Sequence, residues 1–268
     1  MTRLLPGDVA VVTGAARGIG LGLAHAFATR GLRVVLADVD AGELETARAE
    51  VAASGADVVA IPTDVASEEA VFSLAEAALA HFGSVDVVCN NAGVGNDLSP
   101  CWDKSREAFE KIISINLLSV VHGIRAFVPH LVAQGSGHVL NTSSMSGLRS
   151  GSADMGDYAM TKAAVVALTE SLHEDLRTAA PGVGATVLCP GFIRTPLAAQ
   201  QAEKLNRKLN RDDDVSAQWG TPFEPAFAAE VALKAIESNL LYAAPAHNAM
   251  DSIAARFDRL REEISALR

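Results

Sequence analysis

Short apolar runs alternate with longer amphipathic runs along most of the chain. Six apolar runs, rich in valine and isoleucine, lie at residues 8–13, 33–38, 57–64, 85–93, 137–144 and 184–191. Their apolar residues follow one another instead of alternating with polar ones, which predicts strands buried on both faces. The amphipathic runs between them predict helices at residues 19–31, 41–55, 67–83, 104–134 and 158–178, and several of these helices end at a glycine.

The pattern predicts one more cycle near the end of the chain, with a helix at residues 226–238, a strand within residues 240–245 and a last helix over residues 246–268. Strands that alternate with helices form a parallel sheet with helices on both faces. We therefore expect an α/β protein with a single-domain, doubly wound Rossmann fold over residues 1–268 and a mostly parallel seven-stranded sheet. Residues 192–223 lack clear periodicity, and a stretch of this length is typical of a lid over a substrate.

Composition narrows the range of partners. The chain is 49% hydrophobic and has a formal net charge of −10, so it can bury a large core but lacks the basic surface that nucleic acids and anionic membranes attract. The first residues show no signal-peptide pattern, and we expect no membrane-spanning run. Three widely spaced cysteines predict free thiols in a reducing compartment, with no metal site and no disulfide, which favours a cytoplasmic protein.

A glycine-rich segment, TGAARGIG at residues 13–20, follows the first predicted strand and opens a helix. Gly14, Gly18 and Gly20 let backbone amides approach a pyrophosphate, and the start of the helix adds a partial positive charge. The strand before and the helix after favour a dinucleotide site over a plain tight turn. The NNAG segment at residues 90–93, which ends the fourth strand, is interpreted both as a turn and as a floor under the cofactor.

Acidic residues end the second and third predicted strands. Asp38 can accept two hydrogen bonds from the adenosine ribose hydroxyls, and its charge repels a 2′-phosphate, so it favours NAD over NADP. Arg17 has the opposite effect, because a cation beside the loop attracts that phosphate. We give Asp38 greater weight because its charge would lie directly against the phosphate. Asp64 could bind the adenine edge.

Tyr158 and Lys162 stand four residues apart in a predicted helix. Taken alone, such a pair is an ordinary surface feature of one helix face. However, Ser144 ends a predicted strand shortly before, and the carboxyl ends of parallel strands meet at one edge of a sheet, where ligands bind. The glycine-rich loop, Ser144 and Tyr158 are therefore expected on one side of the molecule. There Tyr158 can serve as a general acid or base.

Taken together in this order, these motifs resemble the short-chain dehydrogenase/reductase family in its compact form. The similarity extends over residues 8–196 and includes SINLLSV around Asn116 and PGFIRT at residues 190–195. It implies a catalytic tetrad of Asn116, Ser144, Tyr158 and Lys162. It implies no metal site. It further implies cofactor contacts at Gly14, Arg17, Gly18, Ile19, Gly20, Asp38, Asp64, Val65, Asn91, Ala92, Gly93, Tyr158, Lys162, Pro190, Gly191, Ile193 and Thr195.

Two features depart from the family pattern. The interval from Ser144 to Tyr158 is one residue longer than is common, and Ser143 is a further residue away; we select Ser144. The chain also lacks the glycine-rich ending of many relatives. It ends instead in an amphipathic helix with an apolar stripe of Met250, Ile253, Phe257, Leu260 and Ile264, which predicts either packing on its own core or a subunit contact.

The sequence therefore predicts an oxidoreductase that transfers a hydride between NAD(H) and a secondary alcohol or ketone. Tyr158 would exchange the proton, Lys162 would lower the pKa of the phenol, Ser144 would donate to the substrate oxygen, and Asn116 would anchor a relay water. The alternatives are an NADP(H)-preferring ketone reductase and a non-catalytic dinucleotide sensor. A methyltransferase would not explain the tyrosine–lysine pair. In the family the long helices pair between subunits, which implies a homodimer or homotetramer acting on a small molecule.

Overall fold

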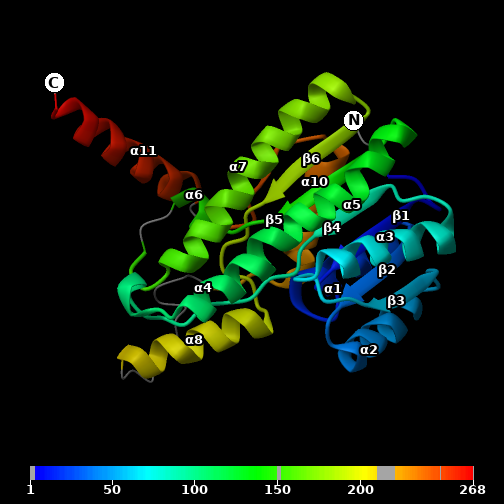
Figure 1. Ribbon diagram of the computed structural model, residues 1–268, viewed down its shortest axis with the longest axis horizontal. Helices are drawn as coiled ribbons and strands as arrows, with labels where there is room; N and C mark the ends of the chain where they lie inside the picture. The colour runs from blue at the N-terminus through cyan, green and yellow to red at the C-terminus, as the bar shows by residue number, and fades with distance from the viewer. Residues whose placement is uncertain (1–3, 150–151, 210–220, 248, 268) are drawn as a thin grey trace.

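A seven-stranded sheet forms the centre of the molecule (Figure 1). The computed structural model describes residues 4–149, 152–209, 221–247 and 249–267. The strands are β1 (Val9–Thr13), β2 (Arg33–Asp38), β3 (Val58–Pro62), β4 (Val87–Asn90), β5 (Gly137–Thr142), β6 (Val183–Leu188) and β7 (Tyr242–Ala243). They lie in the order β3-β2-β1-β4-β5-β6-β7, and every neighbouring pair is parallel. The predicted doubly wound fold is confirmed, and the strand order reverses between β1 and β4.

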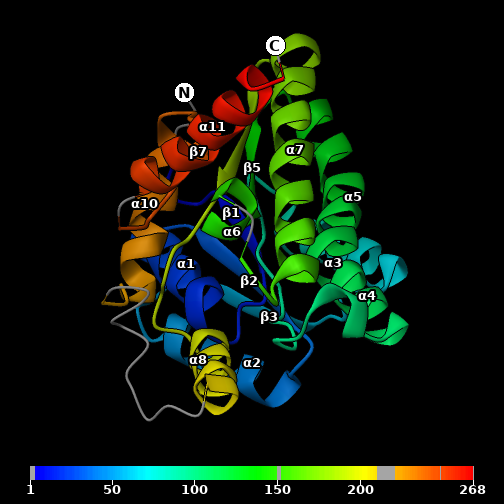
Figure 2. The ribbon, with the colours of Figure 1, turned by 90° about the vertical axis from the view of Figure 1, so that its left-hand side faces the viewer.

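Helices cover both faces of this sheet (Figure 2). One face carries α1 (Gly18–Thr29), α2 (Ala41–Ala52) and α10 (Pro225–Glu237), and the other carries α3 (Glu68–Phe82), α5 (Ser119–Gln134) and α7 (Gly156–Ala179). The remaining described helices are α4 (Arg106–Ile113), α6 (Met145–Arg149), α8 (Pro196–Leu209), α11 (Ala249–Ser265) and the 3₁₀ turn Cys101–Asp103. Because the helices take up both faces, ligands can approach the sheet only from its edges.

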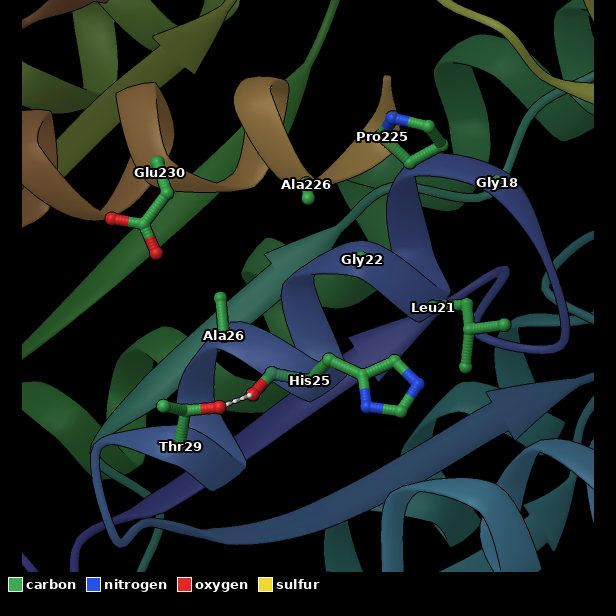
Figure 3. A pocket seen from close by; sticks show the side chains of 9 residues that line it. All are labelled: Gly18, Leu21, Gly22, His25, Ala26, Thr29, Pro225, Ala226 and Glu230. Carbon is green, nitrogen blue, oxygen red and sulfur yellow. Dashed lines mark hydrogen bonds between the residues drawn. The ribbon is translucent and has the colours of Figure 1, made fainter. Parts of the chain in front are cut away.

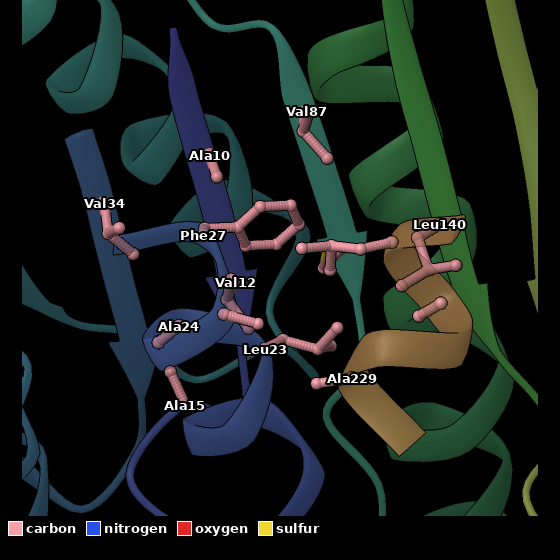
Figure 4. Close-up of a cluster of buried hydrophobic side chains, with 14 of the residues drawn as sticks. Ala10, Val12, Ala15, Leu23, Ala24, Phe27, Val34, Val87, Leu140 and Ala229 are labelled. Carbon is pink, nitrogen blue, oxygen red and sulfur yellow. The ribbon is translucent and has the colours of Figure 1, made fainter. Parts of the chain in front are cut away.

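The side chains of β1 show why the sheet is covered twice. Ala10 and Val12 belong to the cluster under α1 and α10, whereas Val9 and Val11 belong to the cluster under α3, α5 and α7. Figure 4 shows the first cluster, in which Phe27 lies against the strands. All four β1 residues are fully buried. Each of the three valines stabilises the fold by about 1.5–3 kcal/mol when its side chain leaves water, which explains the continuous apolar runs in the sequence.

The predicted helix of residues 104–134 is helical over Arg106–Gln134, but a π-helical segment, Ser114–Leu118, separates α4 from α5. The segment adds a residue to the turn and places Asn116 inside the domain with no exposed surface. By length and composition alone Arg106–Gln134 is apolar enough to cross a membrane, contrary to the expectation from sequence. A core helix of a globular domain has the same composition, and α5 packs here against α3 and β5.

The region interpreted as an irregular lid is partly helical. Residues 196–209 form α8, and the Thr195 hydroxyl caps this helix by accepting a hydrogen bond from Ala198 N at 3.1 Å. Sequence reasoning missed the helix because its polar residues leave a narrow apolar face. Ile193 pairs with Phe223 in an isolated bridge, which joins the two ends of the region. Residues 210–220 of the proposed lid lie outside the described part of the chain.

The end of the chain also differs from expectation. The strand predicted within residues 240–245 is reduced to the two residues of β7, and the last helix begins at Ala249. Among its described residues α11 has none that is buried, so packing of the apolar stripe on the protein's own core is wrong for most of its length. Ile253 alone of the stripe packs, in part, against a core cluster that contains Met145 and Val165.

Burial of His138 makes the fold sensitive to acid. Its Nε2 lies 2.8 Å from Thr186 Oγ1 inside β5–β6, and burial lowers the pKa of the imidazole to about 3 from an ordinary value of 6.5. Between these two pH values the unfolded chain binds one more proton than the folded one. The contribution of neutral His138 to the free energy of unfolding is therefore fully present above pH 6.5. It falls by about 1.4 kcal/mol per pH unit as the pH decreases towards 3.

We expect that His138→Gln reduces the pH slope of the free energy of unfolding by about 1.4 kcal/mol per pH unit, the value for one proton. Glutamine can still hydrogen-bond to Thr186 but does not titrate. Chemical unfolding between pH 7 and pH 4 measures the slope, with substitution of the exposed His130 by glutamine as the control. Equal slopes for the wild type and His138→Gln would contradict the assignment.

Candidate active site at the carboxyl edge of the sheet

The loop between β1 and α1 is built around close backbone contacts. Gly14 has φ = +63°, and a Cβ there would lie 2.8 Å from Ala92 Cα. A Cβ on Gly20 would lie 2.1 Å from the carbonyl oxygen of Gly14. Contacts this short exclude any side chain at either position, so these glycines let the loop lie against the end of β4 and the first turn of α1.

Thr13 anchors the loop to the NNAG segment. Its hydroxyl accepts hydrogen bonds from Asn91 N at 2.9 Å and Ala92 N at 3.1 Å, and Asn91 Nδ2 donates to Thr13 O at 2.9 Å. The predicted cofactor floor is thus also a brace for the glycine-rich loop. Sequence reasoning missed Thr13, although a threonine that ends a buried strand just before a glycine turn is a signal for such a role.

The loop and the start of α1 fit an anionic ligand. Arg17 occupies the N-cap position without a side-chain cap, and the first turn of α1 has no acidic residue. The amides of Gly18, Ile19 and Gly20 therefore stand at the open, positive end of the helix dipole, where a pyrophosphate is stabilised. Thr195 lies across from this turn, because a Cβ on Gly18 would be 3.1 Å from Thr195 Cγ2.

Asp38 sits beside the same loop. Its carboxylate accepts hydrogen bonds from Ala16 N at 3.1 Å and Asp40 N at 3.2 Å, one at each oxygen. Each oxygen accepts only one of these bonds and so retains a lone pair. Because the residue is only half-buried, a ribose diol can reach both oxygens. Arg17, which sequence reasoning set against Asp38, forms an ion pair with Asp40 at 3.2 Å. This pair partly neutralises the cation that would attract a 2′-phosphate.

Asp64 and Val65, which lie shortly after β3, differ from each other. The Asp64 side chain is exposed and accepts a hydrogen bond from Ala66 N at 3.0 Å, so it remains available to a ligand at the edge. Val65 is 8% exposed, and its side chain belongs to the core cluster under α3 and α5. Only the backbone of Val65 can face a cofactor.

The two serines at the end of β5 have different partners. Ser143 Oγ is buried and donates to the carbonyl oxygen of Lys162 at 2.7 Å, so it ties β5 to α7. Ser144 hydrogen-bonds to the hydroxyl of Tyr158, and its Oγ also accepts from Ser146 N at 3.1 Å. Burial raises the pKa of Tyr158, and the hydrogen bond to Ser144 lowers it in part. The geometry thus favours Ser144 over Ser143 as the partner of the phenol.

Lys162 is buried on the same helix. Its Nζ donates to Thr142 O at 3.0 Å and lies 5.9 Å from the centre of the Tyr158 ring. Burial lowers the pKa of this ammonium to about 8. That Lys162 lowers the pKa of the phenol stays a prediction, and the ammonium lies close enough to the ring to act on it.

Asn116 lies in the π-helical segment and faces the loop after β4. Its Nδ2 donates to Val94 O at 2.9 Å, and its Oδ1 accepts from Val94 N at 2.8 Å. A Cβ on Gly93 would lie 3.3 Å from Asn116 Oδ1 and 3.5 Å from Lys162 Nζ. Gly93 is therefore the point where Asn116 and Lys162 meet, and the predicted tetrad converges on one edge of the sheet.

The segment after β6 completes this edge. Pro190 O accepts a hydrogen bond from Met145 N at 2.9 Å, Gly191 N donates to Pro245 O at 3.1 Å, and Ile193 is buried. Together with the Thr195 contact at Gly18, these bonds hold residues 190–195 between α6 and the glycine-rich loop. All the predicted site positions thus lie along the carboxyl edge, with the Val65 side chain turned inward.

A buried ion pair that the sequence did not indicate holds the start of α7. Lys104 Nζ and Asp157 Oδ2 are 3.2 Å apart, and their side chains are 1% and 2% exposed. Asp157 Oδ1 also accepts from Asn96 Nδ2 at 2.7 Å and from Tyr158 N at 2.8 Å. The network fixes the backbone of Tyr158. No local signal could have revealed it, because its members are separated by dozens of residues along the chain.

Helix α8 is attached to the loop after β4. Gln201 Nε2 and Lys204 Nζ both donate to Asn96 O, at 3.1 and 3.0 Å, and Lys208 Nζ donates to Leu98 O at 3.0 Å. Asn96 therefore connects α8 to the ion pair beside Tyr158. These bonds hold α8 against the loop after β4.

A groove between α1 and α10 lies on the opposite face of the sheet from α7 (Figure 3). It has a volume of about 410 Å³ and is lined mainly by small and apolar residues, among them Leu21, Gly22 and Pro225. Within it the Thr29 hydroxyl donates to His25 O at 2.8 Å, which is a bond internal to α1. None of the tetrad lines this groove, so we place the chemistry at the carboxyl edge.

Comparison with known proteins agrees with this geometry. The profile of the family described as "short chain dehydrogenase" matches residues 8–206. The chain is 43% identical over 211 residues to 1-deoxy-11-beta-hydroxypentalenate dehydrogenase from Streptomyces exfoliatus, which covers 78% of this chain and 75% of the relative.

Two solved structures extend the comparison to the fold. A short chain dehydrogenase/reductase from Burkholderia phymatum in complex with NAD has a TM-score of 0.87 and 34% identity, and the match covers 98% of this chain and 97% of the other. A variant of actinorhodin polyketide ketoreductase with NADPH has a TM-score of 0.82 and 25% identity, over 92% and 97% of the two chains. Structural neighbours thus bind either nicotinamide dinucleotide.

The chain has only two tyrosines, so the phenol of Tyr158 can be titrated by absorbance in a Tyr242→Phe background. We expect that Ser144→Ala raises the pKa of Tyr158 further, because it removes the hydrogen bond that lowers it. Ser143→Ala is the matched control and should leave that pKa unchanged, since Ser143 hydrogen-bonds to the Lys162 carbonyl and to Cys189 and not to the phenol. Equal shifts in both variants would contradict the pairing of Ser144 with Tyr158.

Proposed function

The chain belongs to the short-chain dehydrogenase/reductase family, and from this premise we propose that it interconverts a secondary alcohol and its ketone with NAD(H), using Tyr158 as the general acid and base. The family assignment makes it an NAD(P)-dependent dehydrogenase or reductase, as the motifs predicted. The observation that carries the finer proposal is the hydrogen bond between the half-buried side chains of Ser144 and Tyr158, beside the buried Lys162.

Each residue has a separate task in this proposal. Tyr158 gives its proton to the substrate oxygen during reduction and takes one from the alcohol during oxidation. Ser144 donates to the same oxygen as it becomes negative, which is most effective in a site that excludes water. The nicotinamide, when bound, supplies or accepts the hydride. Asn116 positions Lys162 and the loop at Gly93 through its two bonds to Val94.

The depressed pKa of Lys162 suits it to pass protons. With a pKa of about 8, the ammonium can lose its proton near neutral pH, whereas an ordinary lysine cannot. Its position between Thr142 O and Gly93 lets it reach the phenol side and the loop after β4. We propose that it replaces the proton that Tyr158 gives up, and that it does so through a water held near Asn116.

The preference for NAD over NADP rests on charge. The Asp38 carboxylate, fixed by two backbone amides, faces the place of the adenosine ribose, and the Arg17–Asp40 pair reduces the attraction for a 2′-phosphate. The first alternative, an NADP(H)-preferring ketone reductase, requires Arg17 to leave that pair. The second, a non-catalytic sensor, offers no reason to retain all four tetrad residues in one cluster.

We propose a small-molecule substrate and a homo-oligomeric protein. The described part of α8 is bonded to Asn96, and we propose that the substrate lies between this helix and Tyr158. The outer helical layer exposes apolar side chains, among them Leu118, Val132 and Met160 on the α4–α5 stretch and α7. Apolar side chains on neighbouring helices of one face are suited to a subunit contact.

Tyr158→Phe tests the catalytic assignment. The ring still packs, so we expect NAD(H) affinity within a few-fold of the wild type while turnover falls by at least about a hundredfold, the usual contribution of a general acid. NADH consumption with a panel of ketones and fluorescence titration of NADH measure the two effects. Turnover above a tenth of the wild-type value would refute the role of Tyr158, and no wild-type turnover with retained NADH binding would favour the sensor.

The cofactor preference is tested at three positions. We expect kcat/KM for NAD(H) to exceed that for NADP(H) by at least about tenfold, or 1.4 kcal/mol. Asp38→Ser should reduce or reverse the ratio because it removes the repulsion. Asp40→Asn keeps the cap of α2 but frees Arg17, so it should raise the use of NADP(H), and Arg17→Ala should cancel that gain. A wild-type preference for NADP(H) would overturn the proposal.

A further inference from the structure

The last helix carries an apolar face that the other described residues leave open. In Figure 1, α11 begins beside α6 and extends away from the body. Met250 is 75% exposed, Phe257 is 56%, Ile264 is 55% and Leu267 is 88%. A helix of 17 residues that contacts the body only near its start is marginally stable in water over the rest of its length, so this face points to a partner.

The spacing of the apolar side chains identifies the kind of partner. They alternate at intervals of three and four residues from Met250 to Leu267, through Ile253, Phe257, Leu260 and Ile264. This is the a/d pattern of a heptad, with an average period of 3.5 residues. It forms a narrow seam for one other helix instead of the broader face that packs on a globular core.

We propose that α11 pairs with α11 of a second copy of this chain as an antiparallel two-stranded coiled coil. In this register an a residue faces a d residue, so Phe257 lies opposite Leu260 of the partner subunit. The flanking g positions are Arg256 and Glu263. Two-fold symmetry brings Arg256 to Glu263 of the partner subunit twice, and each is a pair of opposite charges.

The parallel arrangement is disfavoured by the same charges. There the g position of one helix faces the e position of the other, and Arg256 would face Arg261 of the partner subunit. In the antiparallel register Arg261 faces the small, neutral Ala254 of the partner subunit instead. The antiparallel pair thus combines a continuous apolar seam with two attractive pairs and no facing pair of like charges.

The contacts that α11 already makes leave room for this pairing. Arg256 Nη1 donates to Leu148 O at 2.7 Å, and a guanidinium has further donors. Glu263 Oε1 accepts from Arg259 Nε at 2.8 Å, so its second oxygen can meet Arg256 of the partner subunit. Ile253, partly packed on the core cluster below α6, sets the seam against the body at its first turn.

The outer face of α11 argues against a lipid surface as the occupant. It carries both signs of charge, with Asp251, Asp258 and Glu262 as well as Arg259. Helices that lie on anionic membranes have a predominantly basic polar face. A mixed, solvated face opposite an apolar seam is typical of the outside of a coiled coil.

Charge reversal tests both the pairing and its direction. We expect that Arg256→Glu and Glu263→Arg each weaken self-association by at least about tenfold, and that the double variant restores it. Glu262→Arg is the matched control on the outer face and should change nothing. Sedimentation equilibrium across a concentration series measures the association. Stronger association of Arg256→Glu would indicate a parallel pair, and no effect of any variant would indicate no pair; either result would overturn the proposal.

A distance measurement separates this contact from any other subunit interface. A single spin label at Ser265, in a Cys101→Ser background that removes the exposed thiol, reports on the intact protein. The antiparallel register displaces the two labels by 13 residues, or about 20 Å along the axis. A defined distance in that range, lost in Ile264→Asp, supports the proposal. The absence of a defined distance, or binding of monomers to anionic vesicles through α11, would refute it.

Discussion

A parallel sheet has to be covered on both faces, and the rest of this structure depends on that requirement. The strands contribute alternate side chains to two separate apolar clusters, one under α1 and α10 and the other under α3, α5 and α7. Helices therefore occupy both faces. The polar backbone at the strand ends then becomes the only place where loops, charges and ligands can meet, and the site lies there because the faces are filled.

At that edge, backbone hydrogen bonds position the reactive side chains. Thr142 O holds the ammonium of Lys162, the backbone of Val94 holds Asn116, and the buried Lys104–Asp157 pair holds the start of α7. Each bond satisfies a group whose burial would otherwise cost about 1–3 kcal/mol. The same burial raises the pKa of Tyr158 and lowers that of Lys162, so the two values move apart and the ammonium loses its proton at a lower pH than the phenol. Stability of the edge and reactivity of the phenol thus arise from the same contacts.

The last helix differs from the rest of the fold because its apolar side chains are exposed. Its apolar residues follow the heptad spacing, yet among the described residues of α11 none is buried within one chain. An exposed seam of this kind is satisfied by a second helix. If two copies pair through this seam, the two parts of the chain have separate roles. The edge of the sheet holds the active site, and α11 joins the subunits.

The sequence by itself determined the parallel sheet, its helices and the edge that holds the site, because continuous apolar runs, glycine stops and strand-end residues such as Asp38 and Ser144 are local signals. Tertiary structure decided what depends on distant partners. It separated Ser144 from Ser143, paired Arg17 with Asp40, built the buried Lys104–Asp157 pair and turned the Val65 side chain inward. These outcomes follow from contacts between segments far apart in the chain, where burial and geometry act and no local pattern records them.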